Sequence, residues 1–397
     1  MDILRKYHNR LINDTDLSHY RYNMDSLPWS EKLLGIKGLR GVGKTTLLLQ
    51  FIKKQYGLSD KALYVSLDDL YFTENKLIDL VEDFSALGGE HLFVDEVHKY
   101  PNWSIELKNI YDYYKNLKVV FTGSSLLEIL NSRSDLSRRA LVFQMKGMSF
   151  REYLNFHYNT GFTAITLEDI IENHIELALA IGSKIKPLKY FPEYLKHGYF
   201  PFYHGNTENY RRSLQEILNM IIEIELPMLR NTNVSIIPKI KQLLYIIAMN
   251  VPFQPNISAL ASKIGVTRTT ILEYLNYLSD AQVLSSIYKK SVGISLLQKP
   301  DKLYLENTNY SYAIGFIKPN LGNLRETFFQ NQLSESHQIN IAEKGDFIID
   351  QKYTFEIGGK SKDYSQIANI DNSYIAADQI EFGTGHKIPL WLFGFLY

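Results

Sequence analysis

Over the first 150 residues, short apolar runs alternate with longer stretches in which apolar residues recur at helical spacing. The apolar runs lie at 33–36, 62–67, 91–94, 118–121 and 140–145. Each is short enough to form one buried strand, and the periodic stretches at 44–56, 74–84 and 103–116 predict helices. Buried strands separated by helices are typical of a parallel sheet covered on both faces. We therefore predict an α/β domain over residues 1–150.

The pattern becomes helical after this point. Residues 151–230 contain strongly periodic stretches, and Ser149 with Glu152 has the spacing of a capping box at the start of the first helix. We predict a helical lid subdomain over residues 151–234. Plain helical packing is the alternative for these helices.

Three helices and a strand are predicted between residues 235 and 300. The helices lie at 238–249, 256–264 and 268–278, and the strand lies at 283–290. A turn that contains Gly265 joins the second helix to the third. Two short helices joined by such a turn and followed by a ribbon indicate a winged helix-turn-helix.

The last predicted domain covers residues 301–397. Its pattern predicts a helix at 324–333, two short strands at 346–350 and 353–357, and a closing apolar run at 388–397 that we expect to be a buried strand.

Composition adds three limits. Lysines and arginines number 43 and acids number 43, so no overall charge favours nucleic acid or a membrane surface. The chain has no cysteine, which excludes disulfides and thiolate metal sites and agrees with a reducing cytoplasm. The N-terminus lacks an apolar signal segment, and no stretch approaches the ~20 apolar residues of a membrane span. We expect a cytoplasmic protein that does not contact the membrane.

The residues between the first strand and the first helix of the sheet carry the main chemical signal. They are Gly38, Leu39, Arg40, Gly41, Val42, Gly43, Lys44, Thr45 and Thr46. The spacing G-x-x-x-x-G-K-T in a strand–turn–helix context is that of a P-loop. Its glycines let backbone N–H groups surround phosphate oxygens, Lys44 would reach the β- and γ-phosphates, and the Thr45 hydroxyl would ligate Mg²⁺. We predict that ATP with Mg²⁺ binds at residues 38–46.

A second signal follows the strand at 91–94, where an apolar run ends in Asp95 and Glu96. This is the form of a Walker B strand. Asp95 would orient the magnesium hydration shell, and Glu96 would polarise the attacking water. With the turn at 38–46, this pair predicts a P-loop NTPase whose sheet has an additional strand. The predicted lid at 151–234 would lie beside the nucleotide and move on hydrolysis.

The strand at 118–121 leads into hydroxyl side chains, one of which would face the γ-phosphate. We take Ser124 or Ser125 as this sensor, with Thr122 as the third choice. Three arginines follow, at positions 133, 138 and 139, and Arg138 is our candidate for stabilising transition-state charge in its own or a neighbouring subunit. A solvated basic loop is the alternative for these arginines.

The winged-helix segment has a modest basic excess. Between 235 and 300 seven lysines and arginines face two acids, a local charge of +5. Thr267, Arg268, Thr269 and Thr270 begin the predicted recognition helix and would contact DNA phosphates. Glu273 lies close behind and would oppose such contacts. Many winged helices only join proteins, so a contact with protein is the alternative to duplex DNA for this segment.

The C-terminal domain holds a second candidate site. A turn centred on Gln351 would place Asp346 opposite Glu356, and like charges so placed need a metal or a lysine between them. Lys360 follows after two glycines, and a bulge there would bring it back to these acids. With Glu326 on the helix, this arrangement resembles the PD-(D/E)XK nucleases, which hold Mg²⁺ at such acids. Those enzymes usually carry Glu-x-Lys, and this chain departs from that spacing, which favours a degenerate domain that does not cut DNA.

The motifs together resemble the bacterial and archaeal AAA-type ATPases that pair an N-terminal P-loop domain with a C-terminal domain of unknown function. The segments that carry the resemblance are 38–46, 93–101 with Trp103, 121–125, 148–153 and 197–201. The resemblance implies nucleotide binding and hydrolysis and names no substrate.

The predicted fold is therefore a P-loop NTPase with a helical lid, a winged helix-turn-helix and a small restriction-endonuclease-like domain. The predicted function is Mg²⁺-dependent ATP hydrolysis, with the nucleotide state transmitted to the C-terminal domains and with homo-oligomers among the partners. The alternatives are an ATP-regulated DNA nuclease and a DNA-binding regulator that uses ATP only as a ligand.

Overall fold

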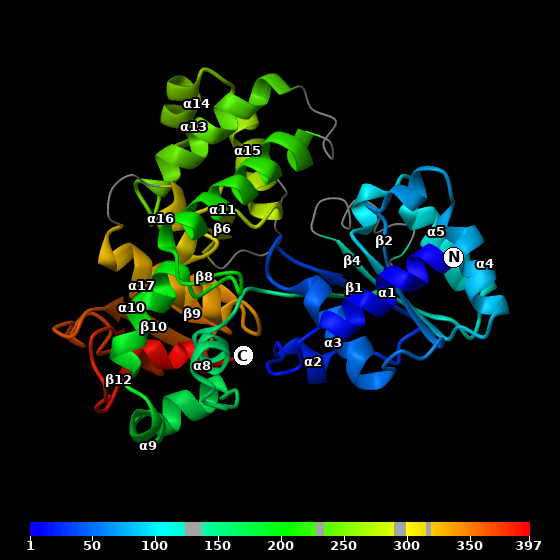
Figure 1. Cartoon of the computed structure of the whole chain (residues 1–397). Helices are drawn as coiled ribbons and strands as arrows, with labels where there is room; N and C mark the ends of the chain where they lie inside the picture. The colour runs from blue at the N-terminus through cyan, green and yellow to red at the C-terminus, as the bar shows by residue number, and fades with distance from the viewer. Residues whose placement is uncertain (124–135, 137, 228–233, 290–298, 315–318) are drawn as a thin grey trace. The chain divides into compact units, whose positions relative to one another are not determined.

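The computed structural model divides the chain into two compact units, residues 1–147 and residues 148–397. It describes residues 1–123, 136, 138–227, 234–289, 299–314 and 319–397 (Figure 1). The second unit contains all the segments that the sequence assigns to a lid, a winged helix and a nuclease-like domain. That finer division stays a prediction.

The first unit is built on a five-stranded parallel sheet. Its strands are β1 (Leu33–Lys37), β2 (Ala62–Ser66), β3 (His91–Asp95), β4 (Lys118–Gly123) and β5 (Leu141–Gln144). Their order in the sheet is β2-β3-β4-β1-β5. β4 is thus inserted between β1, which precedes the turn at 38–43, and β3, which ends in Asp95. The P-loop sheet predicted from the sequence is confirmed, including the additional strand.

Helices cover this sheet. They are α1 (Asp2–Asp14), α2 (Asn23–Ser26), α3 (Lys44–Gln55), α4 (Leu77–Ala86) and α5 (Trp103–Tyr113), with short 3₁₀ turns η1 (Leu70–Thr73) and η2 (Val97–Lys99). Right-handed crossovers place α3 on one face of the sheet and both α4 and α5 on the other. In agreement, α4 contacts α5, and α1 contacts α3 and β2. The core beside the sheet is built from buried apolar side chains, and all five residues of β3 are buried.

The second unit begins with helices, as the sequence predicts: α8 (Phe150–Tyr158), α9 (Leu167–Lys184), α10 (Pro187–His197) and α11 (Thr207–Met220), which continues as a π-helical turn η3 (Ile221–Glu225). Both bonds of the predicted capping box are present, because Ser149 accepts from the Glu152 N–H and Glu152 accepts from the Ser149 N–H. Helices α8, α9 and α10 all pack against η5 (Leu390–Phe395), a 3₁₀ helix near the end of the chain. The lid role of these helices stays a prediction.

The central part of this unit has the element order expected from the sequence. A 3₁₀ turn η4 (Val234–Ile236) leads into α13 (Ile237–Ala248), α14 (Ile257–Ile264) and α15 (Arg268–Asp280). Gly265 ends α14 with φ of 72°, a conformation that glycine adopts without strain. Strands β6 (Leu284–Ile287) and β7 (Lys302–Leu305) then pair antiparallel. These are the elements of a winged helix-turn-helix, which remains our interpretation of this segment.

The C-terminal part contains helices α16 (Thr308–Ile314) and α17 (Leu321–Leu333) and a second sheet. The strands are β8 (Ile339–Ile341), β9 (Phe347–Ile349), β10 (Tyr353–Gly358), β11 (Ser373–Ala377) and β12 (Lys387–Pro389), in the order β12-β11-β10-β9-β8. β10, β11 and β12 run parallel, while β8, β9 and β10 alternate in direction. The closing run was expected to be a strand throughout, but only its first residues belong to β12, and η5 follows because it fills the core against α8 and α17.

Candidate functional site

The turn between β1 and α3 is shaped by its glycines. Gly41 and Gly43 have φ of 84° and 99°, a region that side chains with a Cβ rarely adopt. A Cβ on Gly38 would lie 2.3 Å from the carbonyl oxygen of Met145, so no larger residue fits there. The turn therefore curls tightly over the start of α3, and the first backbone N–H groups of that helix face the space that the turn encloses.

Lys44 is the first residue of α3 and is buried. Its Nζ donates hydrogen bonds to the carbonyl oxygens of Gly38 and Leu39, both at 2.9 Å. The ammonium group is thus held across the turn, where the P-loop pattern places it for contact with phosphate oxygens.

Asp95 ends β3 and is almost completely buried, with 1% of its surface exposed. Three hydroxyl groups surround its carboxylate. Thr45 donates to Oδ2 at 2.5 Å, Tyr64 donates to the same oxygen at 2.9 Å, and Thr122 donates to Oδ1. Neutral donors satisfy the buried carboxylate without cancelling its charge. The structure thus brings together Thr45 and Asp95, the two residues predicted to act on Mg²⁺.

Glu96 is the first residue after the same strand and has a φ of 53°. Its backbone N–H faces Asp95 Oδ1 at 3.1 Å and the Thr122 hydroxyl at 3.3 Å, and these contacts hold it in the left-handed conformation. Burial raises the pKa of the Glu96 carboxyl, while the positive charge of Lys44 lowers it. The His98 Nε2 lies 3.4 Å from Glu96 Oε2, and burial lowers the pKa of His98 to about 3, so this histidine is neutral.

The structure places the other predicted residues of this site at different distances from Asp95 and Glu96, and some lie outside the described residues. Arg40 lies close enough to Glu96 to lower the pKa of that carboxyl. Thr122, the third choice as sensor, is fully buried and bonded to Asp95. Arg138 is exposed, and Arg139 donates to Asp112 at 2.9 Å. Ser124, Ser125 and Arg133 lie outside the described residues.

Two residues of this region were not found from the sequence. Tyr64, on β2, touches Asp95, although the pattern marks it only as one apolar position of a strand. Arg21 donates to the carbonyl oxygen of Val42 in the turn and, at 2.8 Å, to that of Lys146 beyond β5. Neither has a motif of its own. Tyr64 is brought to Asp95 by the pairing of β2 with β3, which the sequence pattern does not specify.

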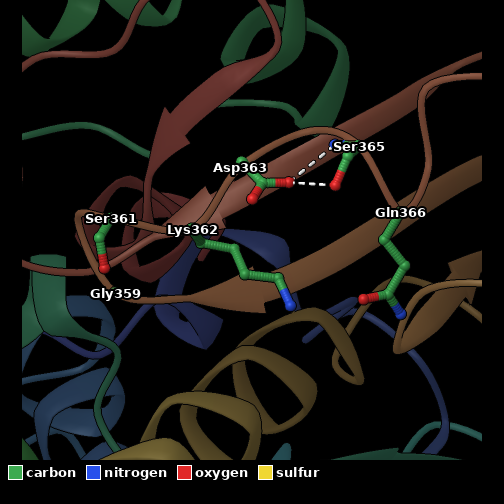
Figure 2. Close-up of a pocket in the computed structure, with 6 residues that line it drawn as sticks. All are labelled: Gly359, Ser361, Lys362, Asp363, Ser365 and Gln366. Carbon is green, nitrogen blue, oxygen red and sulfur yellow. Dashed lines mark hydrogen bonds between the residues drawn. The ribbon is translucent and has the colours of Figure 1, made fainter.

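The second candidate site lies in the C-terminal sheet. Tyr353 pairs with Ile349 and Phe355 pairs with Phe347, so the hairpin turns at Gln351 and Asp346 lies opposite Glu356, as predicted. The prediction that Lys360 returns to these acids is wrong. Lys360 is exposed, and Lys362 contacts Glu356 instead, because the loop after β10 folds back over the strand (Figure 2).

Glu326 of α17 and Lys302 of β7 complete this cluster. Lys302 Nζ lies 3.5 Å from Glu326 Oε2 and 3.5 Å from Asp346 Oδ1. Tyr304, two residues further on the same strand, donates its hydroxyl to Glu326 at 2.7 Å. Burial and the neighbouring Asp346 raise the pKa of Glu326, and burial raises the pKa of Glu356. Lys302 was not found from the sequence, because its partners lie 24 and 44 residues further along the chain and no local pattern links them to it.

Comparison with known families agrees with the first site. Residues 30–154 match the family model described as "AAA domain", and residues 188–310 match a "Domain of unknown function (DUF8612)". The first match contains the turn at 38–43, Asp95 and Glu96. The chain thus carries an AAA-type P-loop domain followed by a domain of unknown function, as the resemblance implied.

One curated relative and several solved structures are similar to this chain. The uncharacterized protein MJ1637 of Methanocaldococcus jannaschii is 28% identical over 300 residues, which is 69% of this chain and 62% of that protein. The chain therefore spans less than two thirds of this relative. The Walker-type ATPase PABY2304 of Pyrococcus abyssi has a TM-score of 0.41 at 14% identity, over 78% of this chain and 95% of that one. The ORC1 protein of Aeropyrum pernix, in complex with DNA, has a TM-score of 0.32 at 13% identity, over 78% and 91%.

Among the described residues, no helix combines the length and the apolar character needed to cross a membrane.

Proposed function

We propose that this AAA-type protein binds ATP with Mg²⁺ at the turn 38–46 and hydrolyses it, and that the nucleotide state is passed to the C-terminal unit. The observation that carries the proposal is the bond between Thr45 and Asp95, which joins the turn after β1 to the end of β3. These are the two segments that a P-loop ATPase needs side by side.

The donor set at this point suits the substrate. A hydroxyl and a carboxylate are the hard oxygen ligands that Mg²⁺ prefers, and both are already within bonding distance of each other. When bound, Mg²⁺ would neutralise charge on the phosphate oxygens. The N–H groups at the start of α3 and the ammonium of Lys44 would hold those oxygens.

Glu96 is the proposed base that orients and polarises the attacking water. Its raised pKa increases its affinity for a proton compared with an ordinary glutamate, and this favours the task. His98 remains neutral at working pH and contacts the carboxylate, so we assign it to positioning Glu96. Ser124 as sensor and Arg138 as a charge-stabilising arginine, in this subunit or in a neighbour of a homo-oligomer, complete the proposal.

A route for coupling begins at Arg21. Its guanidinium donates hydrogen bonds to the carbonyl oxygen of Val42 in the turn and to that of Lys146, which lies two residues before the second unit. A movement of the turn on hydrolysis would act on this connection. Arg21→Met should leave ATP binding in place and abolish the ATP-dependent change in hydrogen exchange of α8. An unchanged response in this variant would remove Arg21 from the route.

The proposed activity is tested by phosphate release from ATP, measured for the wild type and Lys44→Ala with and without duplex DNA. We expect magnesium-dependent release by the wild type and background release by the variant, because the ammonium group that holds the phosphates is lost. Equal release by both proteins would contradict the proposal. A DNA-dependent change in the rate would identify duplex DNA as an effector.

Duplex DNA is a second candidate partner. Thr267, Arg268 and Thr269 at the start of α15 are exposed, as a recognition helix requires. The basic excess is smaller in the folded chain, since Lys241 pairs with Glu223 of η3. Binding should weaken steeply with salt and be reduced in Arg268→Ala. Binding that is unaffected by this substitution would place the DNA elsewhere.

A further inference from the structure

The nuclease-like resemblance implies a Mg²⁺ site at the acids of the second sheet, and the residues there allow this to be tested. Three carboxylates gather, from Glu326 on α17, Asp346 before β9 and Glu356 on β10. Asp346 raises the pKa of both glutamates by its charge, in addition to the effect of their burial. Three acids brought this close require compensating positive charge.

Lys302 supplies the first of these charges. Its Nζ lies between Glu326 and Asp346, at 3.5 Å from an oxygen of each, and only 16% of its side chain is exposed. The lysine comes from β7, in the ribbon that follows α15. Its ammonium group therefore occupies the space between two carboxylates from different elements, where a bridging cation would bind.

Lys362 supplies the second charge. A Cβ on Gly358 would lie 2.6 Å from both Cβ and Cγ of Lys362, so the stem of this lysine fills the place of a side chain at 358. Its Nζ contacts Glu356 Oε1. Figure 2 shows that this side chain lines a pocket together with Gly359, Ser361, Asp363, Ser365 and Gln366.

The carboxylate oxygens of this cluster differ in the partners that they have besides the lysines. Asp346 Oδ2 accepts the N–H of Ile357 at 2.9 Å, and Glu326 Oε2 accepts the Tyr304 hydroxyl. Glu356 Oε2 is buried and has no hydrogen-bond partner among the residues that the structure describes. Mg²⁺ requires near-octahedral oxygen ligation with several waters, and two ammonium groups already neutralise the carboxylates that would supply those oxygens. In the described part of the chain, no three His, Asp or Glu side chains are arranged to hold a metal.

We infer that Lys302 takes the place of the divalent cation, so that this nuclease-like cluster is a metal-free ionic junction between β7, α17 and the β9–β10 hairpin. The same ribbon is joined to the C-terminal part at other points. Ser285 of β6 donates to Gln330 of α17 at 2.9 Å, and the Ile341 N–H of β8 donates to the Tyr288 carbonyl oxygen at 3.0 Å. The junction thus fixes the ribbon of the winged-helix segment to the second sheet.

The test uses the full chain without nucleotide. Mn²⁺ binding is followed by electron paramagnetic resonance in the wild type, Asp346→Asn and Lys302→Met, with Lys360→Met as a control for an exposed lysine of the same domain. We expect the wild type, Asp346→Asn and Lys360→Met to bind Mn²⁺ alike. Lys302→Met should bind Mn²⁺ about 10-fold more tightly than the wild type, or more. The double variant that also carries Asp346→Asn should lose this gain.

Two results would overturn the inference. One is a Mn²⁺ site in the wild type that Asp346→Asn removes. The other is a folded Lys302→Met protein that binds no more Mn²⁺ than the wild type. If Lys302→Met does not fold, the wild type and Asp346→Asn still test the inference, because a Mn²⁺ site that Asp346→Asn removes would overturn it. Thermal unfolding with millimolar MgCl₂ gives a second readout, since the ion should raise the unfolding temperature of Lys302→Met more than that of the wild type.

Discussion

The two acidic sites of this chain are built from similar carboxylates but are satisfied by different partners. In the first unit, the buried Asp95 accepts hydrogen bonds from the hydroxyls of Thr45, Tyr64 and Thr122. In the second, Asp346 and its neighbouring acids face the ammonium groups of Lys302 and Lys362. Both solutions remove the cost of a buried carboxylate, but they leave different net charges behind.

The difference shows how a carboxylate is kept available for a cation. A hydroxyl donor satisfies an oxygen while the negative charge remains, and the hydroxyl can itself become a ligand when a metal binds. An ammonium group cancels the charge and has no lone pair to offer. We therefore expect the cluster at Asp95 to act with Mg²⁺ and the cluster at Asp346 to be structural.

The largest effect should come from exchanging one carboxylate in each cluster for its amide. Glu96→Gln should lower ATP hydrolysis by about 10²- to 10⁴-fold, because the proposed base is lost, while ATP still binds. Glu356→Gln, its counterpart in the second unit, should hydrolyse ATP at the wild-type rate. Phosphate release under saturating ATP compares the two. Equal losses in both variants would end the distinction between a catalytic and a structural cluster.

The next effect concerns the hydroxyl at the end of the turn. Thr45→Ala should raise the Mg²⁺ concentration needed for half-maximal hydrolysis by about 10- to 100-fold, because one oxygen ligand is missing. Thr45→Ser keeps the hydroxyl and should restore the wild-type requirement. The measurement is a Mg²⁺ titration of the hydrolysis rate at fixed ATP. A requirement that does not change in Thr45→Ala would show that this hydroxyl is not a ligand.

A smaller effect is expected on stability. Lys302→Met should lower the free energy of unfolding by about 1–3 kcal/mol, because Glu326 and Asp346 lose their shared partner. Lys360→Met changes an exposed lysine and should stay within about 0.5 kcal/mol of the wild type. Urea unfolding of both variants measures the difference. Equal stability would mean that Lys302 contributes no net attraction to the junction.

The smallest effect is a shift in pH dependence. Because burial raises the pKa of Glu96, its carboxylate is lost at a higher pH than the ordinary value of 4.5. The hydrolysis rate should therefore fall on acidification with a midpoint above that value. His98 stays neutral across this range, since its pKa lies at about 3. The rate–pH profile of the wild type checks the midpoint, and an acid limb at or below the ordinary glutamate value would contradict a buried base.

Local spacing was enough to predict that the turn at 38–46 and the acids at 95–96 lie close together. The turn at 38–46 and the acids at 95–96 are each contiguous in sequence, and the order of strands in a parallel sheet brings them together. The β9–β10 hairpin was predicted in its correct register for the same reason, because a short turn fixes which residues pair.

The errors concern contacts that no local pattern specifies. In α1 the buried face contains Leu4, His8 and Ile12, while the apolar Ile3 and Tyr7 are exposed. His8 can occupy a buried position on this face because its Nδ1 accepts a hydrogen bond from the N–H of Tyr64. Lys302 and Tyr64 contact partners that lie between 24 and 44 residues away in sequence, and single-sequence periodicity carries no information about such pairs.

The most direct test of the contrast counts metal ions with a non-hydrolysable ATP analogue bound. Equilibrium dialysis with Mn²⁺ should find one tightly held ion per chain in the wild type and in Asp346→Asn, and none in Asp95→Asn. Two ions per wild-type chain, or an ion that is lost in Asp346→Asn and kept in Asp95→Asn, would contradict the account.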